Sequence, residues 1–204
     1  MSGLAFGARH PALRCGRCGR FAAWEESRLQ IVCDCRPHLD LLPVLVREAT
    51  TPEERETALG LFKRHFGHAP LVAFGRPVTL DGAEALLAEA EKEIGAALAW
   101  RPFEGAFHII ALATEPMWQR AGLGGHLVAE AELMARQREH TRVIVTLAND
   151  NIPALYFYQR RGYRITAVIP DSFASPRSTP APVGFAGIPI LDEVQLSKSL
   201  QSST

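Results

Sequence analysis

Hydrophobic residues recur along this chain with two periods, one typical of strands and one of helices. The stretch V-L-V-R-E-A-T, residues 44–50, is short and mostly apolar, and it predicts the first strand of the main domain. Thr51, Pro52 and Glu54 then combine an N-cap, a first-turn proline and a capping box. They predict a helix that runs to about Phe66 and ends at Gly67. Its buried face is predicted to hold Ala58, Leu59, Phe62 and Phe66.

The next segment carries conflicting signals. A-E-A-L-L-A-E-A-E-K-E, residues 83–93, consists of strong helix formers, and its propensity alone predicts a helix. Residues 94–100 and 106–112, however, look like consecutive strands joined by an R-P-F-E-G turn. A strand at about 84–91 would extend that meander. We favour the strand, for a topological reason given below.

The C-terminal part alternates helices and strands. A loop at 119–125 opens a helix to about His140, and strands are predicted at 142–148 and 163–169, on either side of a helix at 153–161. A loop at 170–189 leads to a closing strand at 191–200. The buried stripe of the longer helix is predicted to hold Leu123, Leu127, Ala131 and Met134. This order indicates an α/β or mixed α+β fold.

Composition narrows the function classes. Hydrophobic residues make up 47% of the chain, and 22 basic residues balance 22 acidic ones. A neutral chain lacks the broad basic surface of a nucleic-acid coat protein. We find neither a run of about 18 apolar residues nor the apolar core of a secretory signal. We therefore expect a soluble cytoplasmic protein, with no membrane partner and with nucleic acid disfavoured as a partner.

All four cysteines lie between residues 15 and 35. The first two form C-G-R-C-G, a metal-knuckle pattern, and a 14-residue spacer long enough for a small hairpin precedes the second two. Four thiolates in a reducing compartment suit a tetrahedral, structural Zn²⁺. We therefore divide the chain into a zinc-ribbon-like segment, residues 1–42, and a main domain, residues 43–204. His38 in place of Cys35, a redox pair and free thiols remain alternatives. The predicted metal ligands are Cys15, Cys18, Cys33 and Cys35.

The loop Gln119-x-x-Gly122-x-Gly124 lies between a predicted strand and a predicted helix. Glycines permit close backbone approach, and the unpaired amides of a helix start form an anion site that suits a pyrophosphate. A turn that only lets strand and helix pack closely is the alternative. The loop is neither a Rossmann fingerprint nor a Walker loop.

Two motifs together resemble one superfamily. E-P-M-W-Q-R-A-G-L-G-G-H-L-V, residues 115–128, is similar to the acyl-CoA loop of the GNAT superfamily of N-acetyltransferases. N-D-N-I-P-A-L-Y-F-Y-Q-R-R-G-Y, residues 149–163, resembles its second signature. The resemblance covers residues 43–204. It implies an α+β fold with a mixed, mostly antiparallel central sheet flanked by helices, in which the fourth and fifth strands splay apart. The antiparallel run before the loop is why we favour a strand at 84–91.

The resemblance also implies where acetyl-CoA binds. The pantetheine arm would lie between the splayed strands and the pyrophosphate against the glycine loop. Leu112 and Thr114 would pair with the arm through their backbone, and Asn151 would lie near it. The residues expected around the pyrophosphate are Gln119, Arg120, Gly122, Gly124 and Gly125.

Two residues are expected to carry the proton transfers. Tyr158 matches the superfamily's general acid, which protonates the departing thiolate; the alternative is a packing role. His108 lies eleven residues before Gln119, where similar sequences carry a glutamate base. A neutral imidazole can accept a proton, although a lone histidine on an apolar strand also suits a core position. Glu115 and Glu104 are alternative bases.

The sequence thus predicts an acetyl-CoA-dependent N-acetyltransferase in which a primary amine attacks the thioester directly in a ternary complex. The acceptor would be a small-molecule or protein amine, and the protein a monomer or homodimer. Two alternatives remain: an acyl-CoA sensor that the zinc ribbon recruits to a partner, and a structural protein with a degenerate loop.

Overall fold

The computed structural model describes residues 44–67, 71–119, 121–173 and 182–200, together with the backbone of two short strands, β1 (Ala23–Glu25) and β2 (Gln30–Val32). The described helices are α1 (Pro52–Phe66), α2 (Leu123–Gln137) and α3 (Ile152–Gln159). The strands of the main sheet are β3 (Val44–Glu48), β6 (Glu84–Ala90), β7 (Glu93–Phe103), β8 (Ala106–Thr114), β9 (Arg142–Ala148), β10 (Arg164–Ile169) and β11 (Glu193–Ser199).

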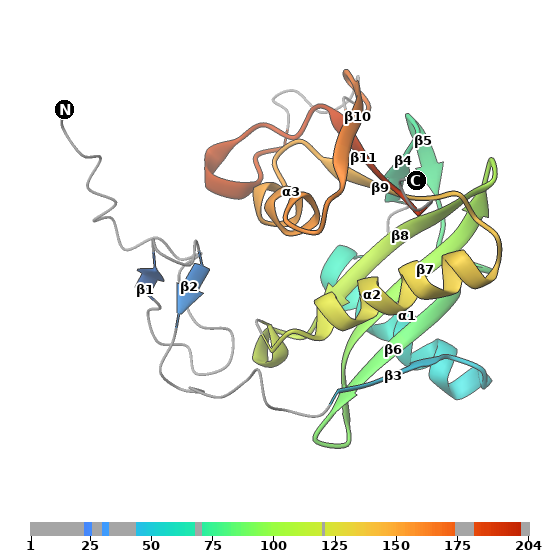
Figure 1. Ribbon diagram of the computed structural model, residues 1–204. Helices are drawn as coiled ribbons and strands as arrows, with labels where there is room; N and C mark the ends of the chain where they lie inside the picture. The colour runs from blue at the N-terminus through green and yellow to red at the C-terminus, as the bar shows by residue number, and fades with distance from the viewer. Residues whose placement is uncertain are drawn as a thin grey trace.

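The main sheet has seven strands within these ranges, in the order β10-β11-β9-β8-β7-β6-β3 (Figure 1). Every neighbouring pair is antiparallel except β8 and β9, which are parallel. The mixed, mostly antiparallel sheet that the sequence predicted is therefore confirmed. No helix in the described parts of the chain is long and apolar enough to cross a membrane.

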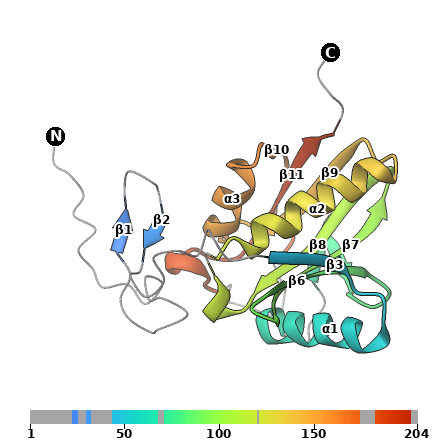
Figure 2. The ribbon, with the colours of Figure 1, turned by 60° about the horizontal axis from the view of Figure 1, so that its bottom comes forward.

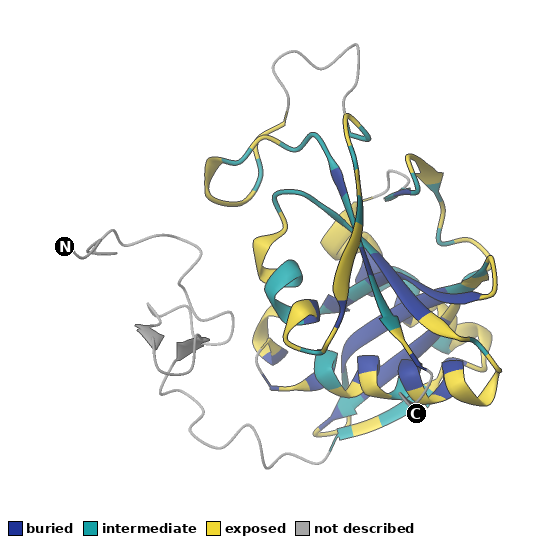
Figure 3. Cartoon of the chain, turned by 45° about the horizontal axis from the view of Figure 1, so that its top comes forward, coloured by how far each residue is buried: buried dark blue, intermediate teal, exposed yellow. Residues whose placement is uncertain are grey.

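Helices cover both faces of the sheet. Figure 2 shows α1 on one face and α2 with α3 on the other, and Figure 3 shows the strands between them as the most buried part of the molecule. Alternate residues of a strand point to opposite faces, so Leu86 joins the core under α2 whereas Leu87 joins the core under α1. Alanines fill much of the sheet centre, where short side chains let the helices pack closely.

The start and end of α1 follow the sequence signals. Thr51 accepts a hydrogen bond from the Glu54 amide and Glu54 completes the capping box, while Gly67 ends the helix at a φ of 76°. The predicted buried face is partly wrong. Ala58 and Phe62 are buried, but the third buried residue is Leu61 rather than Leu59, and Phe66 is 39% exposed. The helix is rotated toward Leu61 because that side chain packs on Leu87 and the alanines of the sheet.

The ambiguous segment is a strand. β6 pairs antiparallel with β3 on one side and with β7 on the other, and residues on both of its faces are buried. Its helix-forming residues do not decide its structure, because two ladders of backbone hydrogen bonds and burial on two faces outweigh propensity differences below about 1 kcal/mol per residue.

The parallel pair β8–β9 is short. It joins Phe107 to Val143, His108 to Ile144 and Ile109 to Val145, and it ends there although β8 continues to Thr114. On its other side β8 stays paired with β7 as far as Thr114, apart from a register shift after Ile109 that leaves one extra residue in β8. A bulge of this kind bends a strand. The predicted splaying of these two strands is therefore present.

A hairpin that the sequence analysis missed lies beside the sheet. It consists of β4 (Leu71–Ala73) and β5 (Arg76–Val78), joined at Phe74 and Gly75 with φ of 56° and 67°. The fully buried Glu193 of β11 accepts hydrogen bonds from the amides of Phe74 (2.9 Å) and Gly75 (3.0 Å). Charge-assisted bonds of this kind are the stronger ones, so Glu193 fixes the turn against the end of β11.

The expected hairpin between the cysteine pairs is present at the backbone level. β1 and β2 form an antiparallel ladder in which Trp24 lies opposite Ile31. The four cysteines and His38 lie outside the described residues. Among the described residues, no three His, Cys, Asp or Glu side chains are grouped so that they could hold a metal ion, and the zinc site and the boundary at residue 42 stay predictions.

Candidate active site

The glycine loop begins α2 at the open end of the splayed strands. Gly122 is the N-cap of α2 in a left-handed conformation, with a φ of 85°. A Cβ on Gly124 would lie 3.7 Å from Leu112, Thr114 and Phe157. The end of β8, the start of α2 and one face of α3 therefore meet at Gly124. The structure brings together four of the predicted cofactor residues: Leu112, Thr114, Gly122 and Gly124.

Gln119 ties this loop to β8. Its side-chain amide donates to the Thr114 carbonyl at 3.4 Å. The preceding turn, η3 (Pro116–Trp118), buries Trp118, and a Cβ on Gly95 would come within 2.7 Å of that indole ring. Because Gly95 has no side chain, η3 packs directly on β7, and the loop that follows η3 lies close to the sheet. Arg120 lies outside the described residues.

Arg161 is a cation beside the loop that the sequence analysis did not single out. A Cβ on Gly125 would lie 2.6 Å from its Nη2 atom. The guanidinium carbon of Arg161 lies 3.7 Å from the centre of the Phe157 ring, and its Nη1 donates to the Phe157 carbonyl at 3.0 Å. A positive charge is therefore held over the start of α2, where the helix dipole is also positive. The two adjacent arginines of Q-R-R-G-Y were the sequence signal that could have indicated this charge.

Asn151 has a structural role in this conformation. Its Oδ1 atom accepts a hydrogen bond from the Ala154 amide at 3.2 Å and caps α3, as asparagine commonly does at a helix start. The residue is exposed. No contact in the described structure ties it to the glycine loop, and its predicted place near the pantetheine stays a prediction.

Tyr158 is buried on the α3 side of the sheet. It is 2% exposed, and its ring packs edge-on against Phe157 and Tyr163, with centroids 5.0 and 5.2 Å away. Burial raises the pKa of its hydroxyl well above the ordinary value, whereas the nearby Arg161 charge lowers it by less. The phenol therefore stays protonated through the physiological range, which a proton donor requires, but the raised pKa also weakens it as an acid.

His108 is buried on the other side of β8. It is 2% exposed, whereas its neighbours Phe107 and Ile109 point into the core under α2. Its Nε2 atom has no hydrogen-bond partner among the described residues. Burial, helped by the positive charge of Arg101, lowers the pKa of this imidazole from 6.5 to about 4. His108 is thus neutral at pH 7 and offers a free acceptor nitrogen.

The two alternative bases lie in different surroundings. Glu115 receives a hydrogen bond from Arg64 of α1 at 2.5 Å, and His65 lies 3.9 Å from its other oxygen. Glu104 is exposed in the tight turn between β7 and β8, with a φ of 47°. Glu115 is held in an ion pair and Glu104 is surrounded by solvent. Neither is a buried acceptor without a partner among the described residues, as Nε2 of His108 is.

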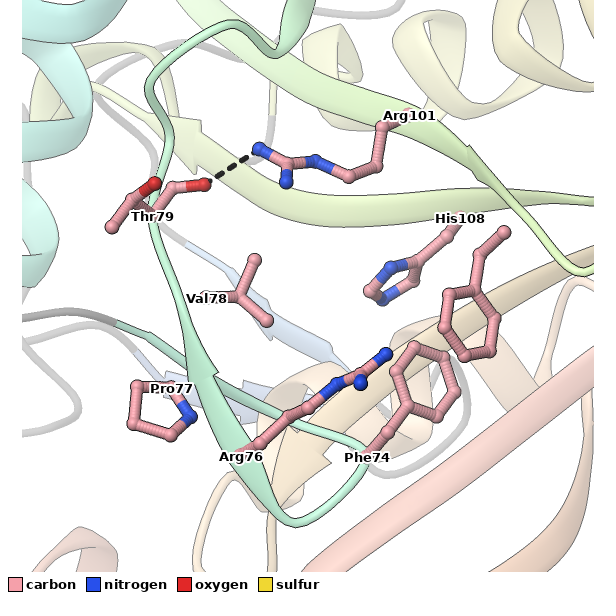
Figure 4. Close-up of a pocket in the computed structure, with 8 residues that line it drawn as sticks. Phe74, Arg76, Pro77, Val78, Thr79, Arg101 and His108 are labelled. Carbon is pink, nitrogen blue, oxygen red and sulfur yellow. Dashed lines mark hydrogen bonds between the residues drawn. The ribbon is translucent and has the colours of Figure 1, made fainter.

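His108 opens into a cavity of about 330 Å³ (Figure 4). The β4–β5 hairpin forms one wall of this cavity, and the adjoining ends of β7 and β8 form the other. The Phe74 ring meets His108 edge-on, with centroids 4.8 Å apart, and stacks on Phe103 at 4.0 Å. The lining residues are Phe74, Arg76, Pro77, Val78, Thr79, Arg101, Phe103 and His108. Sequence analysis found only His108 among these, because the others come together through the hairpin.

The site therefore has two sides, one on each face of β8. On the α2 side are a helix start that suits an anion, the positive charge of Arg161 beside the positive end of the helix dipole, and a buried tyrosine. On the hairpin side are a neutral histidine and a cavity. This arrangement can hold an anionic, chain-like group on one side of β8 and a second reactant on the other, with a proton donor on the first side and a proton acceptor on the second.

Comparison with known proteins finds one matching family model and two similar sequences. Residues 46–163 match the model of the acetyltransferase (GNAT) family. Protein YxbD of Bacillus subtilis, which is uncharacterized, is 27% identical over 151 residues, covering 72% of this chain and 94% of its own. Protein YdhI of the same organism, also uncharacterized, is 32% identical over 90 residues, or 43% of this chain and 56% of its own.

Two solved structures share the fold. An Elizabethkingia anophelis GNAT family acetyltransferase with acetyl-CoA bound is 23% identical, with a TM-score of 0.58, over 78% of this chain and 99% of its own. A Bacillus subtilis acetyltransferase in complex with CoA is 20% identical, with a TM-score of 0.59, over the same shares.

The buried histidine makes stability depend on pH. Because the folded-state pKa of His108 lies below its unfolded value, the unfolded chain binds more protons between pH 6.5 and pH 4. This contribution is complete above pH 6.5 and is lost as the pH falls to about 4, a change of roughly 3 kcal/mol. We expect denaturant unfolding of His108→Phe to lose less stability over that window than the wild type. The exposed His126, changed to Phe, is the control; parallel curves for wild type and His108→Phe would contradict the assignment.

Proposed function

Because the chain belongs to the acetyltransferase (GNAT) family, we propose that it is an acetyl-CoA-dependent N-acetyltransferase in which a primary amine attacks the thioester directly in a ternary complex. The observation that carries this proposal is the glycine start of α2 beside the open ends of β8 and β9. The acetyl-CoA and CoA bound by the two structural neighbours support the same co-substrate.

The residues present fit acetyl-CoA. Beyond Ile109, one side of β8 has no strand partner in the described structure, so its backbone can pair with the amides of a pantetheine arm. The first amides of α2 point outward with the positive end of the helix dipole and suit a pyrophosphate. Arg161 adds a charge at Gly125, and Gly124 leaves space for the chain between Leu112, Thr114 and Phe157.

The chemistry needs a neutral amine and a protonated leaving group. An amine with a pKa of about 10.4 is almost wholly protonated at pH 7, so presenting it neutral costs roughly 4.6 kcal/mol. The amine nitrogen bonds to the thioester carbonyl carbon, its proton passes to Nε2 of His108, and the carbon–sulfur bond then breaks. The thiolate takes its proton from Tyr158. The opposite positions of the two residues about β8 support this division of roles.

The N-terminal segment is proposed to bind one structural Zn²⁺ through Cys15, Cys18, Cys33 and Cys35. The β1–β2 ladder supports this, since it turns the chain back between the two cysteine pairs. Four protein ligands leave no open coordination position, so the metal would hold residues 1–42 folded and take no part in acetyl transfer. The cysteines suit the reducing cytoplasm.

Substitution of two glycines that share the same backbone conformation tests cofactor binding separately from folding. Gly122 and Gly162 both have a φ of 85°, and a Cβ on either would lie 3.8 to 3.9 Å from its nearest neighbour. Alanine at each should cost about 1–2 kcal/mol of stability, because both require the left-handed region. Only Gly122→Ala should also weaken acetyl-CoA binding, by about tenfold. Calorimetry would measure this; equal affinity in both variants would place the pyrophosphate elsewhere.

The proton donor is tested by removing one hydroxyl. Tyr158→Phe keeps the packing against Phe157 and Tyr163, so kcat should fall at least ~100-fold with little change in acetyl-CoA affinity. Tyr156→Phe is the matched control on the same helix, because its hydroxyl only accepts a bond from Arg160 at 2.9 Å. Steady-state CoA release would show the difference. A Tyr158→Phe enzyme within a few-fold of wild type would make Tyr158 a packing residue.

The metal is tested by composition. Purified protein should contain one zinc per chain by elemental analysis, and Cys15→Ser or Cys18→Ser should lose it, since each removes a thiolate ligand. Retention of zinc in Cys35→Ser with loss in His38→Ala would assign the fourth ligand to His38. Four freely titrating thiols in the native protein would rule out the site.

A further inference from the structure

The cavity beside His108 has an unbalanced charge. Two arginines, Arg76 of β5 and Arg101 of β7, line it, and no aspartate or glutamate does. Neither arginine forms an ion pair with a carboxylate among the described residues. The arginine and lysine side chains that do form such pairs there are Arg47, Arg64, Arg138 and Lys198. His108 is neutral at pH 7 and adds no charge. The cavity beside the proposed base, His108, is therefore cationic.

Arg101 is held in place without a counterion. One of its terminal nitrogens donates to the carbonyls of Thr79 (2.7 Å) and Asp81 (3.3 Å), so backbone oxygens fix the guanidinium (Figure 4). Its Nε–H is buried and has no hydrogen-bond partner in the described part of the chain. A buried donor left unpaired is costly, and an arginine presents its donors in a planar fork that matches a carboxylate.

Arg76 lies on the opposite side of the same space. It is exposed at the start of β5, with its guanidinium carbon 5.7 Å from the centre of the Phe103 ring. The stacked rings of Phe74 and Phe103 form an apolar wall beside His108 (Figure 4). Glu193 fixes the hairpin turn that carries Phe74, and the wall is therefore formed before any ligand binds.

The size of the cavity limits what can enter. About 330 Å³ lies at the lower end of the range for small-molecule pockets and suits a compound with roughly the size of an amino acid. Resting on the proposed acetyltransferase function, we propose that the acceptor is a small amine that also carries a carboxylate, with Arg76 and Arg101 binding the carboxylate and the amine directed to His108 and the thioester. The phenylalanine wall favours an apolar side chain on that acceptor.

Matched pairs of amines test this assignment. Each pair consists of an amino acid and its decarboxylated amine: L-phenylalanine with phenethylamine, and L-leucine with 3-methylbutylamine. We expect wild-type kcat/KM to be about 10- to 100-fold higher for the carboxylated member, as for the loss of a charge-assisted hydrogen bond. Glycine with aminomethylphosphonate distinguishes a carboxylate from a phosphate-like group as the bound anion.

The variants connect this preference to the arginines. Arg76→Gln should raise KM for the amino acids and leave the neutral amines unchanged, and Arg76→Lys should restore part of the preference. Arg101→Gln should act in the same direction, with circular dichroism checking that it folds. The control is Arg164→Gln, because Arg164 is exposed on β10 and does not line the cavity.

Three outcomes would overturn the assignment. The first is wild-type turnover of neutral amines as fast as of amino acids. The second is a preference that survives in both Arg76→Gln and Arg101→Gln. The third outcome concerns binding. If no amine is turned over, the acetyltransferase proposal itself fails, and calorimetry of L-phenylalanine with CoA present then tests the anion site separately. Binding that Arg76→Gln abolishes supports the site, and absence of binding overturns it.

Discussion

The early end of the β8–β9 ladder is the constraint on which the rest of the site depends. Three parallel pairs hold the strands together as far as Ile109, and beyond that point β7 is the one strand that pairs with β8 in the described structure. Backbone N–H and C=O groups inside a protein need partners, so the free side of β8 is a ready edge for another extended chain. The bulge after Ile109 bends β8 at the same place, which opens the gap without breaking the sheet.

Charge is arranged differently on the two sides of this gap. The α2 side combines a helix start with Arg161, which is supported by the Phe157 ring and carbonyl, and it suits a phosphate-bearing ligand. The hairpin side places Arg76 and Arg101 around an apolar wall. Each side thus offers its own cationic groups to an anionic ligand, Arg161 with the helix start on one side and Arg76 with Arg101 on the other.

Local signals predicted the parts of the fold that local interactions form. Thr51, Pro52 and Glu54 lie within four positions of one another, and they fix the start of α1 as expected. Residues 84–90 form a strand against their propensity, and only the family resemblance decided for it, since the ladder to β3 joins residues distant in sequence. The β4–β5 hairpin was missed for the same reason. Its strands are three residues long, and Glu193, which fixes it, lies 118 positions from Gly75.

The same separation explains why the histidine was predicted and its surroundings were not. His108 could be proposed from its spacing to the glycine loop, but Arg101 and Phe74 reach it only through the folded sheet and hairpin. In the proposed reaction, these neighbours would connect acceptor binding to proton transfer. Burial is the larger cause of the low His108 pKa and the charge of Arg101 is the second. A carboxylate bound at Arg101, as proposed, would offset that charge and make the imidazole a stronger base with the acceptor in place, whereas without the acceptor the imidazole is neutral at pH 7.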